Sequence, residues 1–503
     1  MPTYYLGSSE RMSAVDNEDL DPQKLKEEGN VFLKAQKYAL AAEKYTNALD
    51  LQPHPIYYAN RAQAMIKLES YGSAISDANE AIKMDSSYIK AYYRRGSAHF
   101  ALGKYKEALK DFQSVARIVP KDPDAIKKLK SCEKAVKAIA FSKALEVDYR
   151  DQAITSMDIS HILVEDSYDG PRLPDEIDEN GGINVPRSFI VEMIEYFKSQ
   201  KLIHRKYVLL ILRAARDIFS KSSSLLRLSL PEESEGDEKE KIQSHFTVCG
   251  DTHGQYYDFC NILLLGGFPS SKNPYLFNGD FVDRGSFSFE VVFTLIAIKV
   301  SDPDAIFMLR GNHETKNMNK IYGFEGEILH KYDILVYNLF SEVFSWLPLA
   351  AVIQDSIFVV HGGLSTKDDG NFLLEEIENI DRGKEPPETG LMSDLLWSDP
   401  QHLAGRSRSK RGVGFSFGPD ITQNFLDKNN LNLLVRSHEV KDEGYVIEHD
   451  GNCITIFSAP NYCDSMGNKG AFIRFETDLI PRFTQFEAVP HPNVPPMRLV
   501  LSQ

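Results

Sequence analysis

The chain has 503 residues, of which 42% are hydrophobic, so it is long enough for two or three domains with sizeable cores. Its formal net charge of −15 disfavours non-specific nucleic-acid binding, and its apolar runs fall far short of the roughly 20 residues that a membrane-spanning helix needs. Five scattered cysteines without a CxxC pair argue against a disulfide framework or a structural zinc site, so we expect a cytoplasmic and nuclear protein with no membrane span and no nucleic-acid partner.

Residues 1–20 show no periodicity and are predicted to form a disordered extension. A repeating helical pattern begins at Asp21. Small residues recur every 33 or 34 positions in three registers, which are Gly29–Ala62–Gly96, Ala41–Ala74–Ala108 and Ala48–Ala81–Val115. This period resembles the tetratricopeptide repeat, in which small residues let paired helices approach closely. Three repeats and a capping helix, about Pro123 to Glu146, would form an all-α solenoid over residues 21–148 with a concave binding face.

Five polar or cationic residues fall at first-helix positions of these repeats and would line the concave face together: Lys26, Asn30, Asn60, Lys90 and Arg94. A solvated face is the simpler explanation for any single lysine. Cations and amides in register, however, resemble the carboxylate clamp of repeat domains that hold the acidic C-terminal peptide of heat-shock protein 90 chaperones. The resemblance implies such a chaperone peptide as a partner.

Residues 149–185 are rich in Asp, Gly and Pro and are predicted to be a linker. From Pro186 to about Leu226 an amphipathic helical region leads into a second domain, predicted to span residues 186–492. Within it, the charged segment 232–243 is best interpreted as a solvated loop without function. Residues 493–503 would form a short tail.

Three short apolar runs in this domain end in a glycine followed by acidic, amide or imidazole side chains: FTVCGDTHG, YLFNGDFVDRG and IFMLRGNHE. Their glycines are 29 and 32 residues apart, about the length of a strand, a crossover helix and the next strand. Ligands of open α/β sheets bind at the carboxyl ends of strands, so the polar residues should converge there. They are Asp251, His253, Asp280, Asp283, Asn312 and His313. Two later runs place His361 and His438 in the same way.

Carboxylate and amide oxygens mixed with imidazole suit a divalent first-row metal. Because these ligands exceed the needs of one four-coordinate site, we predict a centre of two metals that share a carboxylate.

The motifs GDTHG, GDFVDRG, GNHE, HGG, RSHE and SAPNYC occur in this order and resemble the phosphoprotein phosphatase family of binuclear metallophosphoesterases, over roughly Pro186 to Pro492. The resemblance implies an α/β domain with a central β-sandwich flanked by helices. It also implies two metal sites that share Asp280: one with Asp251, His253 and Asp280, and one with Asp280, Asn312, His361 and His438. The metals would be manganese, iron as Fe²⁺ or Fe³⁺, zinc or magnesium, and the sequence does not choose among them.

In such a site, hydroxide formed from a metal-bridging water would attack the phosphorus of phosphoserine or phosphothreonine. His313 would protonate the leaving oxygen, and Asp283 would orient the imidazole. Arg284 and Arg411 match the phosphate-binding arginines of the family, with Lys410 a weaker candidate. Tyr462 would offer a hydroxyl to the substrate, whereas the neighbouring Cys463 is not expected to act as a nucleophile.

Repeats followed by this catalytic domain resemble the type 5 branch of the family over nearly the whole chain. That resemblance implies phosphoprotein substrates, restraint of catalysis by the repeat domain with Glu69 as a contact to the catalytic arginines, and a fatty-acid activator. Residues 21–150 carry 23 Lys and Arg against 16 Asp and Glu, a net charge of +7, so the remainder carries −22. Complementary charge favours docking. The ending PPMRLVLSQ is shorter than the apolar helix usual in the family, so the restraint should be weaker than its norm.

Two other functions are alternatives to a protein phosphatase. The first is a metallophosphoesterase acting on small phosphodiesters or nucleotides, and the RSHE and SAPNYC motifs count against it. The second is a co-chaperone scaffold with little intrinsic phosphatase activity.

Overall fold

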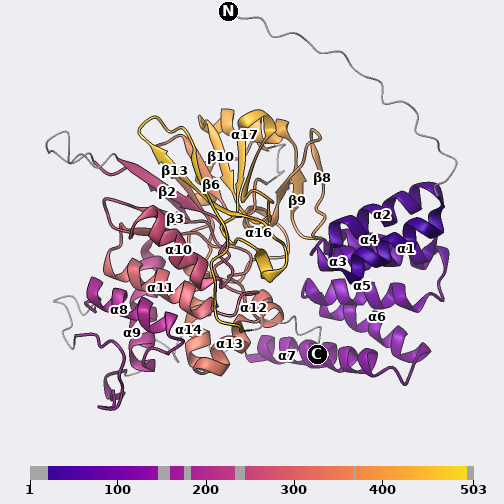
Figure 1. Ribbon diagram of the computed structural model, residues 1–503, viewed down its shortest axis with the longest axis horizontal. Coiled ribbons are helices and arrows are strands. Elements are labelled where there is room, and N and C mark those ends of the chain that lie inside the picture. Colours follow the sequence, from indigo (N-terminus) through magenta and orange to yellow (C-terminus); the bar gives the residue numbers. More distant parts are fainter. Residues whose placement is uncertain (1–20, 146–158, 175–182, 233–243, 366–369, 495–503) are drawn as a thin grey trace, which may run out of the picture. The chain divides into compact units, whose positions relative to one another are not determined.

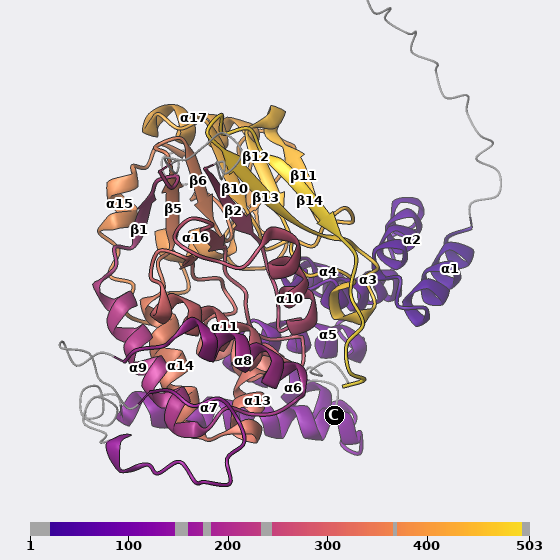
Figure 2. The same ribbon diagram turned by 60° about the vertical axis from the view of Figure 1, so that its left-hand side comes forward.

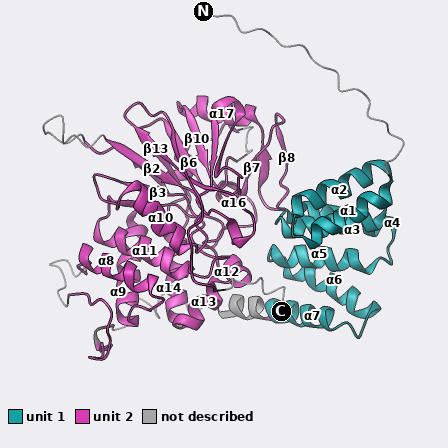
Figure 3. Ribbon diagram, in the orientation of Figure 1, with its two compact units in different colours: residues 1–136 teal, residues 137–503 magenta. Residues whose placement is uncertain are grey.

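The chain forms two compact units, residues 1–136 and 137–503 (Figure 3). The computed structural model describes residues 21–145, 159–174, 183–232, 244–365 and 370–494. The predicted disordered extension, most of the predicted charged loop, parts of the predicted linker and the end of the predicted tail lie outside the described residues.

The first unit is a stack of helix pairs (Figure 1). Its helices are α1 (Pro22–Lys34), α2 (Tyr38–Leu51), α3 (Pro55–Lys67), α4 (Tyr71–Met84), α5 (Ile89–Ala101), α6 (Tyr105–Ile118) and α7 (Pro123–Leu145). The recurring residues Ala41, Ala74 and Ala108 are fully buried between them. A Cβ added at Gly29 would lie 2.6 Å from the Tyr45 ring, so the close approach of α1 and α2 requires glycine. The predicted stack of helical repeats is confirmed.

An ion pair also recurs with the repeat. The Arg61 Nη2 atom of α3 lies 2.7 Å from Asp77 Oδ1 of α4, and Arg95 Nη2 of α5 lies 2.7 Å from Asp111 Oδ1 of α6. Both carboxylates are buried, and each also accepts a bond from the Nε of its arginine. Each pair ties the two helices of one repeat together with a two-pronged, charge-assisted contact.

The second unit is built on two mixed sheets. The six-stranded sheet has the order β1-β5-β6-β10-β12-β11, and the five-stranded sheet has the order β14-β13-β2-β3-β4. The first contains β1 (Leu225–Leu228), β5 (Ala350–Ile353), β6 (Ile357–Val360), β10 (Leu433–Arg436), β12 (Cys453–Ile456) and β11 (Tyr445–Glu448). The second contains β14 (Arg482–Phe486), β13 (Gly470–Glu476), β2 (His245–Cys249), β3 (Tyr275–Phe277) and β4 (Ile306–Met308). A small sheet, β7-β9-β8, is formed by β7 (Asp399–Pro400), β9 (Phe415–Phe417) and β8 (Arg406–Arg408).

The two large sheets pack face to face. Val248 and Leu276 of the five-stranded sheet share one buried cluster with Val359, Val435 and Ile454 of the six-stranded sheet. Within the sheets, β2, β3 and β4 run parallel to one another, as do β6, β10 and β12. The predicted α/β domain with a central β-sandwich is confirmed.

Helices cover both outer faces of this sandwich. The five-stranded side carries α8 (Arg187–Lys198), α9 (Arg205–Lys221), α10 (Tyr256–Gly266), α11 (Ser288–Ser301), α12 (Lys316–Tyr322), α13 (Phe324–Lys331) and α14 (Ile334–Trp346), several of which lie side by side in Figure 2. The six-stranded side carries α15 (Leu374–Glu378), α16 (Leu391–Trp397) and α17 (Pro419–Asn429). The amphipathic helical region predicted from Pro186 to about Leu226 is thus two helices, α8 and α9.

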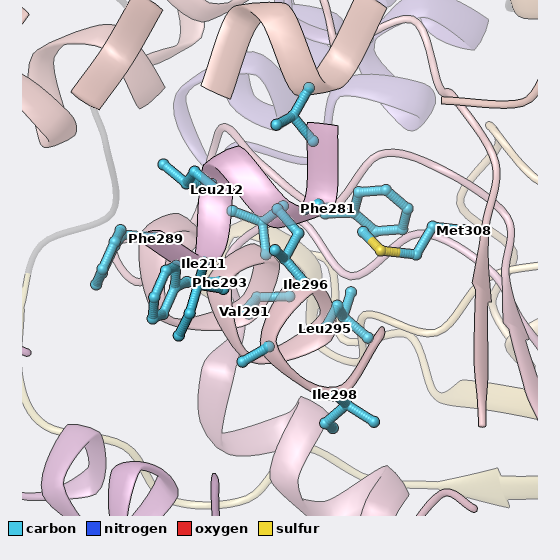
Figure 4. Close-up of a cluster of buried hydrophobic side chains, with 14 of the residues drawn as sticks. Ile211, Leu212, Phe281, Phe289, Val291, Phe293, Leu295, Ile296, Ile298 and Met308 are labelled. Carbon is cyan, nitrogen blue, oxygen red and sulfur yellow. The ribbon is translucent and has the colours of Figure 1, made fainter. Parts of the chain in front are cut away.

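Helix α11 is the centre of the larger hydrophobic cluster. Figure 4 shows Phe289, Val291 and Ile296 of α11 beside Ile211 of α9, with Met308 of β4 nearby. All of α11 from Ser288 to Lys299 is buried. Because α11 directly follows the GDFVDRG motif, this packing fixes the loop that carries the catalytic candidates. Within the described parts of the chain, no helix is both long and apolar enough to cross a membrane.

Candidate metal centre and phosphate site

The predicted ligands come from the ends of five strands in two different sheets. Asp251 follows β2, Asp280 follows β3, Asn312 and His313 follow β4, His361 follows β6, and His438 follows β10. The first three strands belong to the five-stranded sheet and the last two to the six-stranded sheet. The ends of the sheets meet where Asp251 bridges to Phe457 after β12. The motifs predict ligands at the carboxyl ends of the strands of an open sheet, whereas the structure distributes these strand ends over two sheets that converge at the site.

His253 directs its Nε2 at two carboxylates. Its Nδ1 lies 2.9 Å from the Val282 carbonyl, which can only accept, so Nδ1 keeps its proton and Nε2 is the nitrogen that can exchange a proton for a metal. That Nε2 is 3.6 Å from an oxygen of Asp251 and 3.6 Å from an oxygen of Asp280. Ligand atoms of His253, Asp280 and His313 all lie within 4.8 Å of one another.

His361 repeats this arrangement on the other side of Asp280. Its Nδ1 donates to the Asn278 carbonyl at 2.8 Å, which leaves the lone pair on Nε2. Nε2 lies 3.0 Å from Asn312 Oδ1, 3.3 Å from Asp280 Oδ2 and 3.2 Å from His438 Nδ1. All four atoms can act as hydrogen-bond acceptors. Acceptors this close to one another require a cation or a proton between them. The residues therefore fit divalent metals.

The electrostatics agree with this interpretation. Burial lowers the pKa of His253, but the Asp251 and Asp280 carboxylates outweigh it and raise that pKa to about 9. The pKa of His361 is also raised, because Asp280 outweighs the effect of burial. Burial, with Arg411 nearby, holds the pKa of His438 well below its usual value. The ring is therefore neutral, and its Nδ1, which faces His361 Nε2 at 3.2 Å, can offer a lone pair to a metal.

Glu314 supports the shared ligand and was missed by sequence reasoning. Its buried carboxylate accepts the backbone N–H groups of Asp280, Phe281 and Gly311, each at 2.8 Å. These bonds hold Asp280 in a left-handed conformation with φ of 53°. Left-handed backbone is frequent at the site, with φ of 41° at His253, 71° at Asp283, 73° at Arg284 and 70° at His438. The final glutamate of GNHE was the only signal for this role.

His313 and Asp283 form a buried pair. His313 Nδ1 donates to Asp283 Oδ2 at 2.8 Å, which leaves Nε2 available for proton transfer. Asn319 Nδ2 donates to the same oxygen at 3.2 Å, and the Phe324 N–H donates to Asp283 Oδ1 at 2.9 Å. The carboxylate is thus fixed from three directions, and the imidazole ring is fixed by it.

The two arginines predicted to bind phosphate have different contacts. The guanidinium of Arg284 stacks 3.7 Å from the centre of the Tyr322 ring. Arg411 donates to Asp399 Oδ2 at 2.6 Å and to the His438 carbonyl at 2.7 Å, which places it beside a predicted ligand. Asp399 also accepts from the fully buried Arg436 at 2.8 Å. Sequence reasoning missed Asp399, because an SDP segment carries no ligand signature.

Tyr462, the predicted substrate-side hydroxyl, lies beside His253. The Tyr462 ring centre is 5.2 Å from that of His253, so the tyrosine borders the predicted metal centre. Cys463 follows it with φ of 54° and is half-buried. Lys410 is exposed.

The predicted clamp residues lie on α1, α3 and α5 of the first unit. Asn30 Oδ1 accepts from the Tyr45 hydroxyl at 2.8 Å and from Asn60 Nδ2 at 3.2 Å. Lys26 Nζ lies 3.9 Å from Glu27 Oε1, and Lys90 is exposed. Glu69 lies between α3 and α4.

Arg94 differs from its neighbour Arg95. Arg95 is paired with a carboxylate, whereas the guanidinium of Arg94 lies 5.4 Å from the Tyr93 ring centre and has no carboxylate partner among the described residues. Burial lowers the pKa of Arg94. Lys128 of α7, which sequence reasoning missed, lies with its Nζ 5.7 Å from the same ring, and burial lowers its pKa to about 8.

Comparisons with known proteins agree on both units. Residues 244–442 match the calcineurin-like phosphoesterase family, residues 26–89 and 89–122 match tetratricopeptide repeat families, and residues 129–227 match the PPP5 TPR repeat region. The chain is 49% identical over 478 residues to serine/threonine-protein phosphatase 5 of Homo sapiens, covering 94% of this chain and 92% of that protein. It is 46% identical over 488 residues to serine/threonine-protein phosphatase T of Trypanosoma brucei brucei, covering 97% and 98%.

A solved structure is also similar. The protein serine/threonine phosphatase from Saccharomyces cerevisiae matches with a TM-score of 0.58 and 41% identity, covering 62% of this chain and 99% of that chain.

Proposed function

Because this chain belongs to the serine/threonine-protein phosphatase 5 family, we propose that it hydrolyses phosphoserine and phosphothreonine in proteins at a centre of two divalent metal ions. The observation that carries the proposal is the convergence of two oxygens on His361 Nε2, with Asn312 Oδ1 at 3.0 Å and Asp280 Oδ2 at 3.3 Å.

In this proposal, Asp251, His253 and Asp280 hold one metal, and Asp280, Asn312, His361 and His438 hold the other. The donor set of carboxylate, amide and imidazole suits manganese, iron, zinc or magnesium. Two bound cations would lower the pKa of a shared water and neutralise charge on the phosphoryl oxygens.

The chain's own residues handle the phosphate and the proton. Arg284 and Arg411 bind the phosphoryl oxygens, and Tyr462 adds a hydroxyl donor. His313 in its charged form gives the Nε2 proton to the departing serine oxygen, because an alkoxide is a poor leaving group. Asp283 stabilises that charged form through the 2.8 Å bond to Nδ1.

Metal analysis of the purified protein, combined with turnover of a phosphoserine peptide, tests this function. We expect two ions per chain and metal-dependent release of phosphate. Asp280→Asn should lose both metal and activity, since that carboxylate serves both sites. Two bound ions without peptide hydrolysis would contradict the proposal and favour a scaffold without catalysis.

We propose residues 21–148 as a repeat domain that binds an acidic peptide with a free C-terminal carboxylate, of the kind found at the end of heat-shock protein 90 chaperones. A partly buried guanidinium without a carboxylate partner, as at Arg94, is stabilised by an incoming anion. Asn30 and Asn60 already bond to each other and can add donors to the same group. Calorimetry with the full chain should show binding of the free-acid peptide, and equal affinity for the amidated peptide would refute the clamp.

We further propose that the repeat domain restrains the catalytic domain, residues 186–492. The net charges of +7 and −22 on the two parts of the chain favour association, and a linker of a few tens of residues keeps their effective concentration high. Glu69 would contact the catalytic arginines, and an acidic peptide or a fatty acid would favour the open form. The full chain and residues 150–503 should differ in rate on one phosphopeptide. Equal rates with and without acidic peptide would show recruitment without regulation.

A further inference from the structure

Three exposed cations lie on the segment that leads to the phosphate-site residue Arg411. They are Arg406 and Arg408 of β8 and Lys410 just after it. Among the described residues, none of the three side chains has a hydrogen-bond or ion-pair partner. They stand in a part of the chain whose overall charge is strongly negative, so general surface basicity does not explain them.

The geometry of β8 places two of these cations on one face, and Lys410 follows in the turn after the strand. β8 is an edge strand of the order β7-β9-β8, with Arg406 opposite Phe417 and Arg408 opposite Phe415. Side chains two residues apart on a strand share a face and are about 6.6 Å apart. Arg406 and Arg408 therefore lie on the same face of β8.

This row of three cations ends at the proposed phosphate site. Ser409 Oγ accepts the Arg411 N–H at 3.0 Å, and the guanidinium of Arg411 reaches the carbonyl of the ligand His438 at 2.7 Å. Arg408 is three residues from Arg411, at most about 10 Å along the chain. That distance is about one Debye length at physiological salt, so charges near the phosphoserine of a bound substrate interact with the row.

We propose that Arg406, Arg408 and Lys410 form a specificity row that favours substrates with acidic or phosphorylated residues at alternate positions beside the phosphoserine. The proposal rests on the proposed phosphatase function. An extended peptide repeats its side chains at the same spacing of about 6.6 Å, so carboxylates two residues apart match Arg406 and Arg408, and Lys410 adds a third positive charge beyond the strand. Each exposed pair contributes about 1.4-fold to 5-fold in affinity, and three together give roughly a tenfold preference that salt weakens.

Charges on an edge strand also prevent edge-to-edge association of sheets. That role alone predicts that neutralising the row causes self-association and leaves substrate preference unchanged. The two roles are therefore separable by experiment.

The test compares two phosphoserine peptides that differ only in carrying Asp or Asn at three alternate positions, with sets placed on either side of the phosphoserine. The variant is Arg406→Gln with Arg408→Gln and Lys410→Gln. The control combines Lys272→Glu with Lys428→Gln, which changes the net charge by the same three units. Both control lysines are exposed and lie ahead of β3 and β10, at the ends opposite to the metal centre.

We expect the parent to prefer the Asp peptide about tenfold in kcat/KM, mainly through KM, on at least one side. The preference should approach one in the row variant and in high salt, and persist in the control. A parent without preference, or a row variant that retains it, would overturn the proposal. If the triple variant does not fold, Arg408→Glu replaces it and should reduce the preference by severalfold.

Binding of the same peptides, measured by fluorescence anisotropy on the protein as purified, separates this proposal from the catalytic one. Selective binding of the Asp peptide without hydrolysis would refute the proposed function and keep the row. Hydrolysis of both peptides at equal kcat/KM would refute the specificity row and keep the proposed phosphatase function.

Discussion

Replacing Asp283 with asparagine tests the proposed proton donor with almost no change of shape. Asp283 accepts three hydrogen bonds, from His313 Nδ1, Asn319 Nδ2 and the Phe324 N–H. An asparagine that keeps its oxygen toward Phe324 turns its NH₂ group toward His313, which must then accept at Nδ1 instead of donating. The opposite rotamer leaves the buried Phe324 N–H facing another donor, at a cost of about 1–3 kcal/mol.

Either outcome removes the charge-assisted bond that stabilises the imidazolium, which is worth about 1.5–3 kcal/mol. Since each 1.4 kcal/mol is a factor of ten, kcat on a phosphoserine peptide should fall about 10-fold to 100-fold. His313→Ala removes the acid altogether and should cost roughly 10²–10⁴-fold.

The assay compares the phosphoserine peptide with p-nitrophenyl phosphate, whose leaving group departs as a stable anion and needs no proton. Both variants should lose much less activity on the aryl phosphate, and their metal content should match the parent. An equal loss on both substrates, or an unchanged rate on the peptide, would refute the acid assignment.

Four further predictions follow from the two units. Because the pKa of His253 is about 9 in the metal-free protein, a metal that binds below that pH must displace a proton from the ring. The apparent Mn²⁺ affinity measured by calorimetry should therefore rise up to about tenfold per pH unit from pH 6 toward pH 9. An affinity that does not change with pH would contradict this. Arg94→Glu should weaken binding of the free-acid peptide more than about tenfold, since a charge-assisted bond is replaced by repulsion, and should have little effect on the amidated peptide. Burial sets the pKa of Lys128 near 8 and a bound carboxylate would raise it, so peptide affinity should fall as pH rises through 8, and Lys128→Ala should remove that dependence. Arg61→Met leaves the buried Asp77 carboxylate unpaired and should lower the free energy of unfolding by about 2 kcal/mol in denaturant titrations at pH 7, with no loss if the ion pair is only a surface contact.

The sequence predicted the elements whose signals are local. The 34-residue period located the stacked helices because each repeat buries the same small residues, such as Ala41 and Ala74. The strand ends were found because apolar runs stop at a glycine before polar residues. Asp280 and His361 are placed by such runs, and the structure brings them within 3.3 Å of each other.

Contacts between segments that are distant in the sequence could not be predicted from such local patterns. The distribution of ligands over two sheets depends on strand order, which no motif encodes. Glu314 and Asp399 act by accepting bonds from groups brought together only by folding, and Lys128 reaches Arg94's aromatic neighbour from a helix outside the three repeats. Such partners carry no spacing signal.

The left-handed backbone of the proposed metal ligands narrows the choice of amino acids at these positions more than coordination chemistry does. Glutamate and aspartate are both good oxygen ligands, yet Asp280 has φ of 53°, a region that aspartate, asparagine and histidine enter several-fold more often than other side chains. His253 and His438 occupy the same region. A left-handed residue costs roughly 1–2 kcal/mol, which the surrounding sheets must absorb before any metal arrives. A substitution at these positions must therefore satisfy two requirements: its side chain must tolerate a left-handed backbone, and it must be able to bind a metal ion. New ligand sets could arise only among residues that meet both requirements.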